Sequence, residues 1–172
     1  PSGHPDAPAL SVLAAFLRNG FLHRTIREQG GAYGGGASHD PNIAAFRFFS
    51  YRDPRLVETL DDFDASIIWL LETQHEQLGL EEAILSVMAS LDKPGSPAGE
   101  AKRDFHERLF GHTAEHRRIL RAGIVGTTLD DLRRVTETYL KPELASTAVI
   151  THTAGADIVA GRQLPLTRRD LL

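Results

Sequence analysis

The sequence contains no cysteine, and only one methionine and one tryptophan occur among its 172 residues. The lack of cysteine excludes disulfide bonds, thiolate metal ligands and a cysteine nucleophile. The chain also lacks an apolar run of membrane-spanning length, and its first residues, "PSGHPDAPAL", lack the basic and apolar regions of a signal peptide. An excess of positive charge is absent too, because the net charge is -4 and the basic residues are dispersed. We therefore expect neither nucleic acid nor a membrane as a partner.

The composition that remains, 41% hydrophobic and 24% charged, is typical of one compact domain over residues 1–172. Apolar residues at helical spacing predict several helices, and alternating segments around the turn "HDPN" predict a hairpin. A late strand and a possible short one follow the last helix. The expected helices cover residues 6–28, 54–72, 80–92, 100–110, 114–122 and 129–140, and the expected strands cover 32–38, 43–50, 146–152 and 157–160. This order predicts an α+β fold, a small antiparallel sheet flanked by several helices.

Polar residues at the expected helix starts predict three helix caps. Asp53 with Pro54 is expected to begin the second helix. Thr113 is expected to cap the helix that follows Gly111, and Thr128 is expected to cap the last helix.

The motif "HTAEH", His112–His116, matches the HxxEH pattern of inverted zinc proteases. In that pattern, two histidines four residues apart share one helix face and bind zinc. Here Gly111 ends one helix and Thr113 begins the next, so His112 should lie outside the helix that carries His116. We therefore interpret the pair as surface histidines and expect no metal site in this chain.

Five glycines surround Tyr33 within residues 30–37. Glycine in a strand or helix costs roughly 0.5–1 kcal/mol relative to alanine, so the run indicates geometry that larger residues forbid. It spells neither a dinucleotide fingerprint nor a phosphate loop, and no nucleophile, base and orienting group occur together. From the residues alone, Arg27 is explained by the helix dipole and Tyr33 by packing. The chain alone is thus not expected to be an enzyme.

Four segments together resemble the C-terminal part of the presequence protease branch of the M16 zinc metallopeptidases, the family of pitrilysin and insulin-degrading enzyme. These are "LRNGFLHRTIREQGGAYGGGA", "SYRDPRLVETLDDF", "SLDKPGSPAGEAKRDF" and "LFGHTAEHRR". The resemblance covers nearly the whole chain and implies an α/β roll, one of four similar domains in two halves that close around a peptide chamber. Residues 1–172 would be most of the fourth, noncatalytic domain, so the roll would be incomplete.

The resemblance also implies roles for particular residues. Arg27 and Tyr33 match an arginine and a tyrosine that reach across the chamber to hydrogen-bond the substrate backbone and the oxyanion of the transition state. Gly34, Gly35 and Gly36 would leave room for a peptide backbone. For "SYRDP", Ser50–Pro54, a turn with a helix cap is a sufficient explanation, and a chamber contact is the alternative.

The function implied by the resemblance is that of a substrate-chamber domain in a zinc metalloendopeptidase that degrades short unstructured peptides. Its partners would be peptide substrates and the N-terminal catalytic half of the same polypeptide. Zinc would be bound outside this chain, which would be inactive alone. The alternative is a freestanding peptide-binding or scaffold domain whose hairpin adds a peptide strand. We expect a bacterial cytoplasmic location, with a mitochondrial or other organelle matrix as the alternative.

Overall fold

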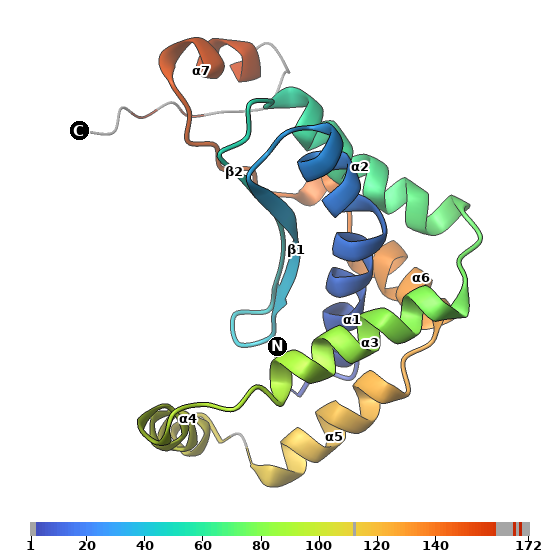
Figure 1. The fold of residues 1–172 in the computed structure, drawn as a ribbon, viewed down its shortest axis with the longest axis vertical. Coiled ribbons are helices and arrows are strands. Elements are labelled where there is room, and N and C mark those ends of the chain that lie inside the picture. The colour runs from blue at the N-terminus through green and yellow to red at the C-terminus, as the bar shows by residue number, and fades with distance from the viewer. Residues whose placement is uncertain (1–2, 112, 161–166, 168, 170–172) are drawn as a thin grey trace.

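A computed structural model describes residues 3–111, 113–160, 167 and 169 (Figure 1). Within this part, seven α-helices accompany one two-stranded antiparallel sheet, which confirms the α+β class. The elements are α1 (Ala7–Leu17), the π-helix η1 (Arg18–Gln29), β1 (Gly34–Asp40), β2 (Ala45–Tyr51), α2 (Val57–Glu72), α3 (Gln77–Leu91), α4 (Pro97–Leu109), α5 (Ala114–Val125), α6 (Leu129–Tyr139), the 3₁₀-helix η2 (Pro142–Leu144) and α7 (Thr153–Ala160). In Figure 1, α7 lies at the end of the molecule opposite α4 and α5.

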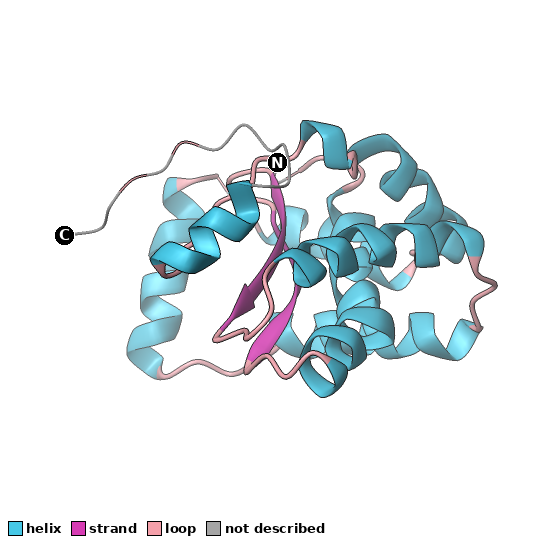
Figure 2. Cartoon of the chain, turned by 90° about the horizontal axis from the view of Figure 1, so that it is seen from above, coloured by secondary structure: helices cyan, strands magenta, loops and turns pink. Residues whose placement is uncertain are grey.

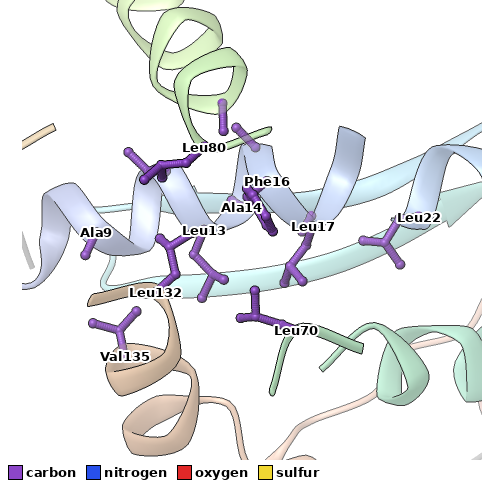
Figure 3. Close-up of a cluster of buried hydrophobic side chains, with 14 of the residues drawn as sticks. Ala9, Leu13, Ala14, Phe16, Leu17, Leu22, Leu70, Leu80, Leu132 and Val135 are labelled. Carbon is purple, nitrogen blue, oxygen red and sulfur yellow. The ribbon is translucent and has the colours of Figure 1, made fainter. Parts of the chain in front are cut away.

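Helix α1 lies at the centre of the core, where β1, α3, α5 and α6 all pack against it. Val12, Leu13 and Leu17 are fully buried, and so are the side chains of α6 and α3 that meet them (Figure 3). A helix that is apolar on nearly every side is stable only when other elements surround it. Seen from above, helices lie on both sides of the two strands (Figure 2). The rigid centre fixes where the segment after α1 begins.

The helix predicted over residues 6–28 is continuous, but its second half, η1, is a π-helix with hydrogen bonds from residue i to residue i+5. Its Leu22 and Ile26 are fully buried. The predicted glycine stop is confirmed, because Gly30 is the C-cap and Gly31 takes a left-handed φ of +80°. The chain turns there and enters β1.

The predicted hairpin is confirmed, with Gly34 paired to Tyr51 at one end and Asp40 paired to Ala45 at the other. The Asp40 carboxylate accepts a hydrogen bond from the Asn42 backbone N–H at 3.1 Å and so shapes the turn. Phe46 and Phe48 on β2 pack against the core cluster, whereas the alternate side chains Phe49 and Tyr51 are exposed. The hairpin therefore has one covered face and one open face.

The predicted cap at Asp53 is wrong, because α2 begins at Val57 with Leu56 at the N-cap position. Asp53 instead accepts hydrogen bonds from the Arg55 backbone N–H and from the hydroxyls of Ser50 and Thr59. An aspartate that closes a local turn in this way is no longer available to cap a helix. The other two predicted caps, Thr113 and Thr128, are confirmed, each as part of a capping box.

The late strands predicted over residues 146–152 and 157–160 are wrong. Residues 145–152 have no regular structure, and the second segment lies in α7. Within the described part of the chain, β1 and β2 pair only with each other, so the β-branched run has no strand to join. Ile150 in this run is 86% exposed. Among the residues described, no helix has both the length and the apolar character that crossing a membrane requires.

Candidate functional site

Tyr33 stands directly before β1, and its side chain is 61% exposed. Its backbone N–H donates to the carbonyl of Arg52 at 3.2 Å, which continues the hairpin pairing by one residue. The Arg52 guanidinium lies over the Tyr33 ring, 5.2 Å from the centroid, and the Tyr51 ring meets it edge-on at 5.8 Å. We name Tyr33, Tyr51 and Arg52 the tyrosine cluster. An exposed phenol is thus held by two neighbours rather than by burial.

Arg52 has a left-handed backbone, with φ at +48°. This conformation is uncommon for a residue with a side chain and costs on the order of 1–3 kcal/mol. It persists because the next residue is firmly bound: the Asp53 carboxylate accepts from the Ser50 hydroxyl at 2.5 Å and from the Thr59 hydroxyl at 2.7 Å. Ser50 lies on β2 and Thr59 lies on α2, so Asp53 connects the strand to the helix. The tight turn therefore fixes the guanidinium above Tyr33.

Arg55 joins this turn to η1. Its guanidinium forms an ion pair with Asp62 at 2.8 Å and donates to the carbonyl of Thr25 at 3.3 Å. The side chain packs against Gly30, where an added Cβ would overlap the guanidinium. Gly30 is buried for this reason. The end of η1, and with it Arg27, is therefore held at a fixed position relative to the start of α2.

Arg27 is exposed in the last turn of η1, and its backbone carbonyl accepts from the Gly31 N–H at 3.1 Å. In the part of the chain that the structure describes, its guanidinium has no ion-pair or hydrogen-bond partner. The structure thus places both predicted site residues, Arg27 and Tyr33, on the surface at the two ends of one short connection. The guanidinium that covers the Tyr33 ring belongs to Arg52.

The space beside each glycine of β1 is filled by a side chain of this same chain. An added Cβ at Gly34 would lie 2.5 Å from the Tyr51 ring, and one at Gly35 would lie 2.9 Å from Ile26. At Gly36 it would lie 2.8 Å from the aliphatic part of Arg18. Close packing alone therefore accounts for the absence of side chains at these positions. That they also admit a peptide backbone stays a prediction.

His116 acts in the cap of α5. Its backbone N–H donates to the Thr113 hydroxyl at 3.3 Å, and its ring Nδ1 lies 3.0 Å from the same hydroxyl. His112, the other histidine of the motif, lies outside the described residues. Across the residues that the structure covers, no three side chains of histidine, aspartate or glutamate form a group that could bind a metal ion.

Sequence reasoning overlooked Tyr51 and gave Arg52 only a minor role. The signal for both was the hairpin register, because pairing Gly34 with Tyr51 also places Arg52 opposite Tyr33. A large exposed aromatic residue opposite a glycine tends to lie across the glycine. The register could not be fixed from the sequence, however, because the turn "HDPN" allows several loop lengths.

The sequence that folds into this helix, glycine turn and hairpin matches a known class of domain. The model of the family "PreP C-terminal domain" matches residues 2–153. The chain belongs to this family, which is part of the presequence proteases among the M16 peptidases.

Three proteins similar to this chain are each named "Presequence protease, mitochondrial". The protein of Eremothecium gossypii is 41% identical over 138 residues, which are 80% of this chain and 14% of the relative. That of Saccharomyces cerevisiae is 38% identical over 141 residues, 81% of this chain and 14% of the relative. That of Mus musculus is 36% identical over 140 residues, 81% of this chain and 13% of the relative. The matches thus span about one seventh of the length of these relatives.

The expected bacterial cytoplasmic location is wrong. The relatives just described are proteins of eukaryotes, and all three carry the word mitochondrial in their names. The names of these relatives agree instead with the alternative, a mitochondrial location.

Proposed function

We propose that residues 1–172 are most of the fourth, C-terminal domain of a mitochondrial zinc metalloendopeptidase that degrades short unstructured peptides. Membership of the PreP C-terminal domain family and the names of the relatives support this proposal. In it, the chain lines part of the chamber in which the peptide is cleaved, and the catalytic half of the same polypeptide faces it.

The observation that carries the proposal is the position of Tyr33, exposed yet held between Arg52 and Tyr51. A phenol hydroxyl can donate a hydrogen bond to the oxyanion that develops at the scissile carbonyl. Such a donor is most effective when its orientation is set before the substrate arrives, because no reorganisation then accompanies the reaction. The tyrosine cluster meets this requirement.

Arg27 supplies the second group. A guanidinium with five N–H donors suits the carbonyl groups of an extended peptide, and the absence of a carboxylate partner among the described residues leaves this one available. Its position in the last turn of η1, near the carbonyl end of the helix, is favourable for a cation. We assign Arg27 to binding the peptide backbone and Tyr33 to the transition state.

Gly34, Gly35 and Gly36 would border the bound peptide. Tyr51 lies across Gly34 and its ring is exposed, so a bound peptide would contact this ring beside Tyr33. Tyr51 would keep its contact with Tyr33 while the peptide is bound.

Among the described residues, no three histidine, aspartate or glutamate side chains lie together as a possible metal site. We assign the zinc of the parent enzyme to a part of the polypeptide outside this chain. The isolated chain should accordingly cleave no peptide, and its contribution is limited to binding and to the orientation of Tyr33.

Photo-crosslinking in the parent protein tests whether a peptide passes Tyr33. Benzoyl-phenylalanine replaces Tyr33 in one variant and Ile119 in a control. Ile119 is 60% exposed, matching Tyr33, but it lies on α5, beyond the turn of the hairpin (Figure 1). A fluorescein-labelled unstructured peptide should crosslink to position 33 and not to position 119. Equal labelling of the two positions, or none at position 33, would refute the proposal.

A further inference from the structure

A cavity of about 310 Å³ opens on the side of the molecule formed by the end of α2, the start of α3 and the junction of α1 with η1. None of the residues that line this cavity belongs to the tyrosine cluster. Aromatic rings line it: Phe16 from α1, Trp69 from the last turn of α2, and His75 from the loop between α2 and α3. Nothing in the function proposed above uses this cavity.

The rings are packed into one aromatic surface. Trp69 stacks on Phe16 with centroids 5.6 Å apart and an interplanar angle of 29°. His75 meets Trp69 edge-on at 4.5 Å, and its Nε2 donates to the carbonyl of Leu70 at 3.0 Å, which fixes the imidazole. Phe16 is buried and Trp69 half-buried. The aromatic surface is therefore rigid and partly open to solvent.

Two glycines keep this surface accessible. Gly20 of η1 and Gly79 of α3 both line the cavity. An added Cβ at Gly20 would lie 2.6 Å from the Trp69 ring, and one at Gly79 would lie 3.4 Å from the Phe16 ring. A longer side chain at Gly79 would extend into the space that is now empty. The cavity thus depends on small residues in two separate helices.

The charge beside the rings is negative. Glu76 and Glu82 line the cavity, both are exposed, and no lysine or arginine lines it. Neither carboxylate has an ion-pair partner within the described residues. The amino end of α3 carries a partial positive charge of roughly half a unit, which is smaller than the two full carboxylate charges. The cavity therefore combines π faces with two carboxylates, and the guanidinium of neighbouring Arg18, which does not line the cavity, donates to Asn19 and Ser86.

We propose that this cavity binds the guanidinium of an arginine side chain in a peptide. A planar guanidinium stacks on aromatic faces more readily than an ammonium and pairs with carboxylates at the same time. An uncharged apolar group would use the rings but would leave both carboxylates without a partner. This inference stands apart from the roles of Arg27 and Tyr33, and its test uses no peptidase activity, so its failure would leave those roles unaffected.

Trp69 is the only tryptophan in the 172 residues, so the tryptophan fluorescence, excited at wavelengths that tyrosine does not absorb, reports on this cavity alone. The chain is titrated with N-acetyl-arginine amide and, in parallel, with N-acetyl-citrulline amide, which has nearly the same shape but no charge. The arginine probe should change the Trp69 emission in a saturable manner, and the citrulline probe should bind about five- to ten-fold more weakly. A response that does not saturate, or equal binding of the two probes, would overturn the proposal.

Variants then locate the site, with far-UV circular dichroism to confirm that each one folds. Gly79→Leu should abolish binding of the arginine probe because the new side chain fills the cavity. Glu76→Gln combined with Glu82→Gln should weaken binding several-fold. Glu81→Gln is the matched control, since Glu81 is exposed on the same helix but does not line the cavity, and it should bind as the unaltered chain does. Undiminished binding by Gly79→Leu would place the probe elsewhere and refute the assignment.

Discussion

The Arg52 guanidinium lies 5.2 Å from the centre of the Tyr33 ring, and the Arg52 carbonyl accepts the Tyr33 backbone N–H at 3.2 Å. One residue therefore contacts both the side chain and the backbone of the other. Both contacts come from Arg52, which lies opposite Tyr33 at the open end of the hairpin, so the pairing of β1 with β2 positions Tyr33. This explains how an exposed phenol can have a defined orientation without burial.

Replacing Arg52 should affect Tyr33 more than it affects folding, provided that the new residue tolerates the left-handed backbone. Arg52→Asn removes the guanidinium but keeps this tolerance, so the free energy of unfolding should change by less than about 1 kcal/mol. The NMR signals of the Tyr33 ring protons should shift, because the cation above the ring is gone. Arg52→Val, which is β-branched, should lower the free energy of unfolding by roughly 1–3 kcal/mol. Equal stability of the two variants would show that the backbone at this position is not strained.

Gly34 and Gly35 should respond differently to alanine. At Gly34 the obstacle is the exposed Tyr51 ring, which can swing aside, so Gly34→Ala should change the free energy of unfolding by less than about 1 kcal/mol. At Gly35 the obstacles are the fully buried Ile26 and, at 3.1 Å, the carbonyl of Phe49. Gly35→Ala should therefore destabilise the chain by roughly 1–3 kcal/mol. Urea unfolding of both variants tests the difference, and a larger loss at Gly34 would show that Tyr51 is held more firmly than its exposure suggests.

Asp6 should make the stability of the chain depend on pH. Hydrogen bonds from Arg134 and from the Tyr139 hydroxyl, opposed by some desolvation, hold the pKa of Asp6 below its ordinary value of 3.8. These bonds join the start of α1 to α6 at 2.8 Å and 2.7 Å. Because the folded pKa is the lower one, the ionised carboxylate stabilises the fold above about pH 4, and this contribution is lost as the pH falls through the folded pKa.

Urea unfolding of Asp6→Asn at several pH values measures this effect. The variant should have a lower midpoint than the unaltered chain at pH 7, and the difference should shrink below pH 4. Asp131, whose pKa is lowered chiefly by the Thr128 hydroxyl, titrates in both proteins, but it shares Arg134 with Asp6, so its contribution does not cancel completely. Glu137→Gln, an exposed change on α6, serves as the control and should show no such convergence. A pH-independent difference for Asp6→Asn would mean that the contact acts through shape and not through charge.

Local signals in the sequence predicted much of the fold. The capping residues Thr113 and Thr128 and the Gly30–Gly31 stop each act through hydrogen bonds within a few residues, so the pattern alone was enough. The predictions were wrong where a strand needed a distant partner, or where several nearby groups competed for one side chain. The run at 146–152 had β propensity but found no partner strand in the described part, and Asp53 bonded to Ser50 and Thr59 instead of capping α2.

Some residues of the candidate site could likewise be predicted from the sequence, and others could not. The glycine run and the family resemblance pointed to Arg27 and Tyr33, and both lie at the surface. The role of Arg52 as the neighbour of Tyr33 could not be predicted, because it depends on the hairpin register and on a left-handed backbone at a residue with a long side chain. The cavity at Trp69 combines residues more than 50 positions apart, which no local pattern indicates.

The steady-state kinetics of Tyr33→Phe in the full-length parent, compared with Tyr51→Phe, test the central claim most directly. Removal of an oxyanion donor costs about 2.7–4 kcal/mol of transition-state stabilisation, a fall of roughly 10²–10³-fold in kcat/KM. We predict this fall for Tyr33→Phe with an unchanged melting temperature, and a much smaller effect for Tyr51→Phe. Normal turnover by Tyr33→Phe together with a lowered melting temperature would show that Tyr33 is a packing residue and would contradict the account.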